Sequence, residues 1–125
     1  MVQKLRELTL NLLRMVTGLL FLCHGAQKLF GAFGGHQMAL ASQMGLAGVL
    51  EFFGGSAIFL GLFTRPVAFI LAGEMAVAYW TVHAHAGPFP IANHGELAVL
   101  YCFIYLFLAA NGGGKFSLGA RLRLG

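Results

Sequence analysis

Six ionisable side chains lie within long runs of apolar residues, where an isolated charge would be costly. Three are glutamates and three are basic residues of the first apolar run: Arg14, His24, Lys28, Glu51, Glu74 and Glu96. A charged side chain at the centre of a bilayer costs about 2.5–3.5 kcal/mol on insertion scales. Each of these groups therefore needs a partner, a ligand or a function.

The depths of these groups predict three layers, each holding one base and one acid. A helical rise of about 1.5 Å per residue lets each base be matched to an acid at a similar depth. The matched pairs are Arg14 with Glu74, His24 with Glu51, and Lys28 with Glu96. We interpret the deepest, Arg14–Glu74, as a structural ion pair that fixes helix register, because helices in lipid lack a hydrophobic drive for association.

The outer half of the predicted bundle gathers more ionisable groups than pairing requires. His83, His85 and His94 add to the layer that holds His24 and Glu51. Histidine titrates near neutral pH, so such a cluster can pass protons or bind a polar head group. The candidates for catalysis are His24, Glu51 and His83, and those for ligand binding are His24, Lys28, Glu51, His83 and Glu96. A purely structural role for these groups stays open.

The histidines and cysteines form no recognisable metal or disulfide motif. His36, His85 and His94 could meet on the outer side, but no HExxH or paired-cysteine motif supports a metal site. Cys23 and Cys102 lie in apolar runs, which is typical of small residues that pack well. We therefore predict no metal site and no covalently bound cofactor.

The composition indicates that lipid is the solvent of this chain. Of its 125 residues, 58% are hydrophobic and 10% are charged, and the mean hydropathy is +0.79. A soluble domain usually carries about 25% charged residues. The net charge of +4 comes from dispersed Lys and Arg residues, with no basic stripe to follow a nucleic acid. We predict one all-α membrane domain, residues 1–125, whose main partner is the lipid bilayer.

Four apolar windows are long enough to cross a hydrocarbon core of about 30 Å, which takes roughly 20 helical residues. They cover about residues 8–30, 46–63, 66–86 and 94–111, and they predict a bundle of four transmembrane helices. Thr64 and Arg65 indicate a very tight turn between the second and third spans. The loop 31–45 is rich in glycine, and its middle, residues 37–44, could form a short interfacial helix.

The basic residues that flank the spans predict the orientation in the membrane. Six of them fall on one side, namely Lys4, Arg6, Arg65, Lys115, Arg121 and Arg123, and only Lys28 borders the other. The positive-inside rule places the more basic side in the cytoplasm. Both termini are therefore predicted to be cytoplasmic, in a multi-pass protein of the inner (plasma) membrane.

Several short blocks along the chain resemble the DoxX family. The first is HGAQKLFG at residues 24–31, similar to the family signature HGxQKLFG. Further blocks are AGVLEFFGG at 47–55, GLFTRP at 61–66, EMAVAYWTVH at 74–83 and NHGEL at 93–97. The family motif residues in this chain are His24, Lys28, Glu51, Arg65, Glu74, His83 and Glu96. His94 departs from the pattern, since the family often has glycine there.

The resemblance implies a four-helix membrane protein with a redox role. DoxX-like proteins include subunits of quinone-linked oxidoreductases and membrane partners of soluble redox proteins. We expect a membrane component whose outer polar pocket binds a quinone or a similar small molecule, with a soluble redox protein as partner. The alternatives are a non-catalytic anchoring or assembly subunit, or a small-metabolite carrier that would act as a homo-oligomer. The sequence has no cofactor-binding motif, which argues against an enzyme acting alone.

Overall fold

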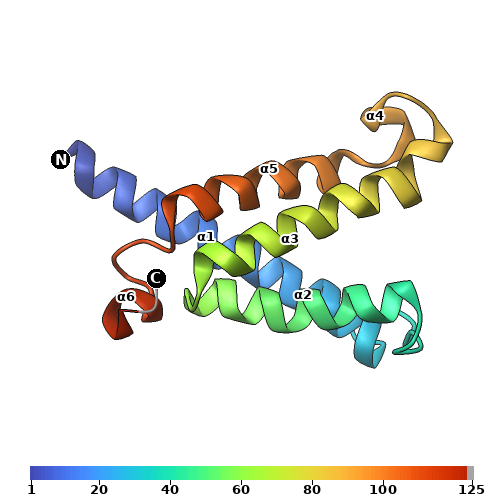
Figure 1. Cartoon of the computed structure of the whole chain (residues 1–125), viewed down its shortest axis with the longest axis horizontal. Coiled ribbons are helices and arrows are strands. Elements are labelled where there is room, and N and C mark those ends of the chain that lie inside the picture. Colours follow the sequence, from blue (N-terminus) through green and yellow to red (C-terminus); the bar gives the residue numbers. More distant parts are fainter. Residues whose placement is uncertain (124–125) are drawn as a thin grey trace.

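Helices joined by short loops make up the part of the chain that the structure describes, residues 1–123 of a computed structural model (Figure 1). The long helices are α1 (Val2–Phe30), α2 (Gln43–Leu60), α3 (Thr64–Ala78) and α5 (Glu96–Asn111). The short elements are the π-helix η1 (Tyr79–His83), the 3-10 helix η2 (Ala84–Ala86), α4 (Pro90–Asn93) and α6 (Leu118–Leu122). No strand occurs within residues 1–123.

The α1 and α2 helices form an antiparallel pair that packs through glycine. A Cβ atom on Gly55 would stand 2.5 Å from the backbone nitrogen of Leu22 and 2.8 Å from the carbonyl oxygen of Gly18. Gly18 and Gly25 face equally close backbone atoms of α2. Small residues let helices in lipid approach closely and gain van der Waals contact, so these glycines fix the first helix pair.

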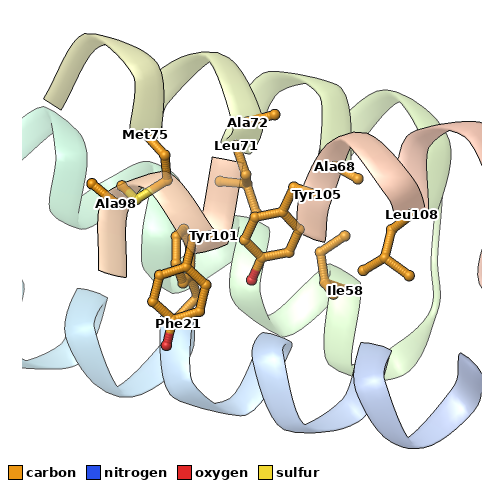
Figure 2. Packing of buried hydrophobic residues seen from close by; sticks show 10 residues of the cluster. All are labelled: Phe21, Ile58, Ala68, Leu71, Ala72, Met75, Ala98, Tyr101, Tyr105 and Leu108. Atoms are coloured by element: carbon orange, nitrogen blue, oxygen red, sulfur yellow. The ribbon is translucent and has the colours of Figure 1, made fainter. Parts of the chain in front are cut away.

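The α3 and α5 helices form the second pair, and apolar side chains join it to the first. Figure 2 shows this core, to which Phe21 of α1 and Ile58 of α2 contribute together with residues of α3 and α5. The hydroxyl of Tyr105 points toward α1 and donates a hydrogen bond to the carbonyl oxygen of Thr17 at 3.0 Å. One polar bond therefore sets the register between α5 and α1 inside an otherwise apolar core.

A tight turn connects the two pairs, as the sequence predicts at Thr64 and Arg65. Gly61, with a φ of 75°, takes the left-handed conformation and ends α2, and α3 begins at Thr64. The two pairs meet at this turn and diverge toward the opposite end, where α4 lies (Figure 1). We call these the turn end and the α4 end of the bundle.

Three helical segments are long and apolar enough to cross a membrane: Val2–Phe30, Gln43–Leu60 and Thr64–Ala86. The apolar helix Glu96–Asn111 is shorter, at 16 residues, and spans about 24 Å at 1.5 Å per residue. Large apolar side chains recur at three- and four-residue intervals on the exposed face of α1, namely Leu5, Leu8, Leu12, Val16 and Leu19. The architecture is that of a helical membrane protein. The fourth crossing and the side on which the termini lie stay predictions.

Helix boundaries differ from the sequence prediction at several places. The first helix begins at Val2 rather than near residue 8, and the second covers Gln43–Leu60 rather than 46–63. The short interfacial helix expected within residues 37–44 is wrong, because residues 35–39 and 42 are non-helical and α2 has begun by residue 43. A backbone hydrogen bond of 2.7 Å from Met38 to Lys28 holds this loop against α1. The short helix α6, capped by the Ser117 side chain, was not predicted.

Candidate functional site

A cavity of about 470 Å³ lies between the two helix pairs, in the half of the bundle nearer α4. Its wall combines α1, α2, α3 with η1, and α5, and most lining side chains are apolar. The polar lining residues are His24, Lys28, Gln43, Glu51, Glu74, His83 and His94. A cavity of this size and composition can bind a small molecule with an apolar body and a polar group.

Lys28 and Glu51 form the one ion pair within residues 1–123. The Lys28 Nζ atom lies 2.6 Å from Glu51 Oε1, and the two side chains are 18% and 3% exposed. The helices approach closely here, since a Cβ atom on Gly48 would stand 2.9 Å from the Cβ atom of Lys28. The predicted pairing of His24 with Glu51 and of Lys28 with Glu96 is therefore wrong.

Glu74 points its carboxyl group into the same region but has no protein donor. Both carboxyl oxygens are buried, and neither accepts a hydrogen bond from a residue of the described chain. Glu51 and Lys28 are ionisable neighbours of Glu74 in the wall of the same cavity. Two carboxylates are both acceptors, so a hydrogen bond between Glu51 and Glu74 requires a proton on one of them.

The tight turn explains why the two carboxyl groups meet. Glu51 precedes Gly61 by ten residues, and Glu74 follows Thr64 by ten. Ten helical residues rise about 15 Å, so both side chains stand at the same height above the turn. The equal spacings can be counted in the sequence, but the packing of the helices is what places Glu74 beside Glu51 rather than beside Arg14.

Arg14 lies at the turn end, where it donates to a backbone carbonyl rather than to a carboxylate. The side chain is 2% exposed, and its Nη1 atom donates a hydrogen bond of 3.3 Å to the carbonyl oxygen of Gly113. Gly61 contacts the same nitrogen closely enough to leave no room for a Cβ atom. The C-terminal ends of α2 and α5, which carry partial negative charge, thus surround the guanidinium. The predicted ion pair between Arg14 and Glu74 is wrong.

The π-helix η1 brings His83 to the cavity. In a regular α-helix His83 would lie on the face opposite Glu74, because nine residues turn through about 900°. A π-helical turn takes an extra residue and rotates the residues after it by about 100°. His83 therefore lines the cavity, and its Nδ1 atom lies 3.2 Å from the carbonyl oxygen of Asn93.

Buried Asn93 organises the loop that closes the α4 end. Its side-chain amide donates hydrogen bonds to the Tyr79 hydroxyl at 3.2 Å and to the Gly87 carbonyl at 2.9 Å. Its side-chain oxygen accepts a bond from the backbone nitrogen of Gly95 at 2.9 Å. These bonds join η1 to the start of α5. The sequence prediction missed Asn93.

The remaining candidate residues divide between the cavity and the surface. His24 and His94 line the cavity, whereas His85 and Glu96 are exposed and do not. Glu96 stands in the first turn of α5, where a negative charge suits the helix dipole. His94 has a φ of 62°, in the left-handed region that favours glycine. This backbone conformation accounts for the glycine expected at that position.

Two aromatic rings line the cavity, whereas the two cysteines do not. Phe21 and Tyr101 both line the cavity and meet edge to face, with ring centroids 4.7 Å apart. Cys23 and Cys102 are free thiols and half-buried. Within residues 1–123 no group of three or more His, Cys, Asp or Glu side chains is placed to hold a metal ion. The sequence prediction did not identify Phe21 or Tyr101 as site residues.

Comparison with known proteins supports a single family. A profile of the DoxX family matches residues 9–84, a range that includes Lys28, Glu51, Glu74 and His83. A Haemophilus influenzae protein without a functional name is 40% identical over 124 residues, covering 93% of this chain and 92% of that protein. The Bacillus subtilis protein named "Putative oxidoreductase CatD" is 32% identical over 111 residues, covering 85% and 81%. No solved structure matches the chain significantly.

Proposed function

The chain belongs to the DoxX family, and from this premise we propose that it is the ligand-binding membrane component of a quinone-linked redox system. The observation that carries the proposal is the cavity, where an ion pair and a second carboxyl group face an otherwise apolar wall. The name of the Bacillus subtilis relative supports a redox role. In this proposal the ligand is a quinone or a similar molecule with a ring and polar substituents.

The cavity is suited to a ligand that arrives from the membrane. Three of its lining side chains, Leu46, Val77 and Leu97, are also exposed on the outside of the helices, by 59%, 55% and 60%. The opening thus has apolar rims, and a lipid-soluble molecule can reach it without crossing water. At the α4 end the side chains of Gln43 and Thr81 join α2 to η1 through a hydrogen bond of 3.4 Å.

The ionisable groups would serve binding and proton exchange. Reduction of a quinone to a quinol consumes two electrons and two protons, and here the electrons come from a soluble redox partner. Glu51 and Glu74 can take up and release protons at the cavity, while Lys28 can donate a hydrogen bond to a carbonyl oxygen of the ligand. His24 stands one helical turn from Lys28 on the same wall.

Substitution of Glu51 by glutamine is expected to weaken quinone binding at least tenfold while the protein still folds. The fold should survive because Glu74 remains beside Lys28 as its counter-charge. Binding is measured as the ligand-induced shift in Tm of detergent-solubilised protein, titrated with a short-chain benzoquinone. His24→Ala should weaken binding in the same assay, because its ring lines the cavity.

Two matched variants control this experiment. Glu96→Gln makes the same chemical change outside the cavity, and His85→Ala removes an exposed imidazole. Both should bind as the wild type does. If the wild type shows no Tm shift with several quinones, or if neither Glu51→Gln nor His24→Ala changes it, the binding function is refuted. The anchoring or assembly subunit then becomes the better account.

We further propose four crossings of the plasma membrane with both termini cytoplasmic, on the strength of the basic residues at the turn end. Single cysteines replacing Ala41 and Phe116, both exposed, test this in a background without Cys23 and Cys102. An impermeant thiol reagent added to intact cells should label position 41 only. Position 116 should react only after the membrane is opened. Labelling of both positions from outside would overturn the topology.

A further inference from the structure

The carboxyl group of Glu74 lacks a hydrogen-bond donor within residues 1–123, and proton exchange alone does not explain this. Its two oxygens are buried without a donor from any residue in 1–123, although it lies in the wall of an open cavity. Buried polar groups in proteins are almost always hydrogen-bonded, since leaving such a group unpaired carries its full desolvation cost. A donor from outside the protein is therefore expected at this point.

No side chain of residues 1–123 donates to Glu74, and several donors around the cavity are bonded to other groups. The Lys28 ammonium is held 2.6 Å from Glu51, and the Gln43 amide donates to Thr81 at the α4 end. The amide of Asn93 is shared between Tyr79 and Gly87. Water can serve Glu74 while the cavity is empty, but a ligand that displaces such water must replace its hydrogen bond or lose affinity.

We infer that Glu74 makes the cavity selective for the reduced, hydroxyl-bearing form of its ligand, a quinol, over the oxidised quinone. This inference rests on the proposed function and specifies the ligand form that the site prefers. A quinol hydroxyl donates to a carboxylate, and such charge-assisted hydrogen bonds are about twice as strong as neutral ones. A quinone carbonyl is only an acceptor, so it opposes the Glu74 oxygens with like partial charge.

The preference has an energetic consequence for the bound couple. A ligand whose reduced form binds more tightly is easier to reduce when bound, so its reduction potential rises. For a two-electron couple, a tenfold preference raises the potential by about 30 mV. The cavity would thus favour electron transfer from a partner protein to the bound quinone.

The test compares the two redox forms of one compound on the same protein. Decylubiquinone is suitable because its ring is fully substituted and cannot add to the thiols of Cys23 and Cys102. Its quinol is kept reduced under anaerobic conditions, and Kd is measured for both forms from the Tm shift and from quenching of Trp80 fluorescence. We expect the wild type to bind the quinol at least tenfold more tightly.

Glu74→Gln is the decisive variant, because its amide has the same shape and offers both a donor and an acceptor. The preference should fall to within about threefold, mainly through tighter binding of the quinone. Glu74→Leu should lose the preference by weakening the quinol and by relieving the repulsion of the quinone carbonyl. Glu96→Gln, the same change outside the cavity, should keep the full tenfold ratio.

The outcomes distinguish the selectivity for quinol from the quinone-binding function itself. Equal binding of both forms by the wild type, or an unchanged ratio in Glu74→Gln, overturns the selectivity and leaves the quinone-binding function intact. Binding of neither form overturns both. A lipophilic arylalkylamine is tested in parallel, because an ammonium group also donates to a carboxylate. If the amine alone binds in a manner that depends on Glu74, the selectivity for a quinol is refuted.

Discussion

Replacing Gly55 by leucine is expected to separate α1 from α2 and to lower the free energy of unfolding by about 3 kcal/mol or more. Even a Cβ atom at this position would stand 2.5 Å from the backbone nitrogen of Leu22 and 2.8 Å from the Gly18 carbonyl. Backbone atoms cannot rotate away as a side chain can, so the whole helix has to move. The effect is large because this pairing also places Lys28 over Glu51.

The measurement is unfolding of the purified protein in mixed micelles, followed by the fluorescence of Trp80. Gly73→Leu is the matched control, since no atom apart from the local backbone of its own helix lies within 4 Å of a Cβ atom there. That control should be at least as stable as the wild type, because leucine has a higher helix propensity than glycine. Equal stability of the two leucine variants would contradict the close glycine packing of α1 and α2.

Replacing Lys28 by methionine is expected to cost about 3 kcal/mol, the lower end of the range for breaking a buried ion pair. The variant leaves Glu51 and Glu74 side by side without a cation. Two neighbouring carboxylates repel each other, and in a site of low dielectric constant the repulsion is weakly screened. We expect the lower end of this energy range because the Lys28 side chain is 18% exposed, so the ion pair is not fully buried.

A double substitution distinguishes this electrostatic cause from lost packing. Lys28→Met with Glu51→Gln removes one charge of each sign, so it should recover much of the stability that Lys28→Met loses. Lys115→Met removes a charge from an exposed lysine and should leave Tm unchanged. If the double variant is no more stable than Lys28→Met alone, the ion pair does not stabilise the fold.

The sequence alone determined the helical membrane architecture and most of the residues of the site. Hydropathy and the spacing of turn residues are local properties, so the long apolar helices, the tight turn at Thr64 and the end of the last apolar helix at Asn111 were predicted within a few residues. The cost of burying charge singled out His24, Lys28, Glu51 and Glu74, and all four line the cavity. The excess of histidines in the outer half added His83, which lines it too.

Only the tertiary structure decided which of these groups are partners. The predicted layers measured each depth from the end of its own helix, but the helix ends do not stand at one height, since α1 begins six residues before the predicted boundary at Leu8. Arg14 therefore meets the carbonyl of Gly113, and Lys28 meets Glu51. The π-helix likewise turned His83 toward the cavity. Partner choice depends on how helices tilt, pack and rotate against each other, and those quantities are set by contacts between segments distant in the sequence.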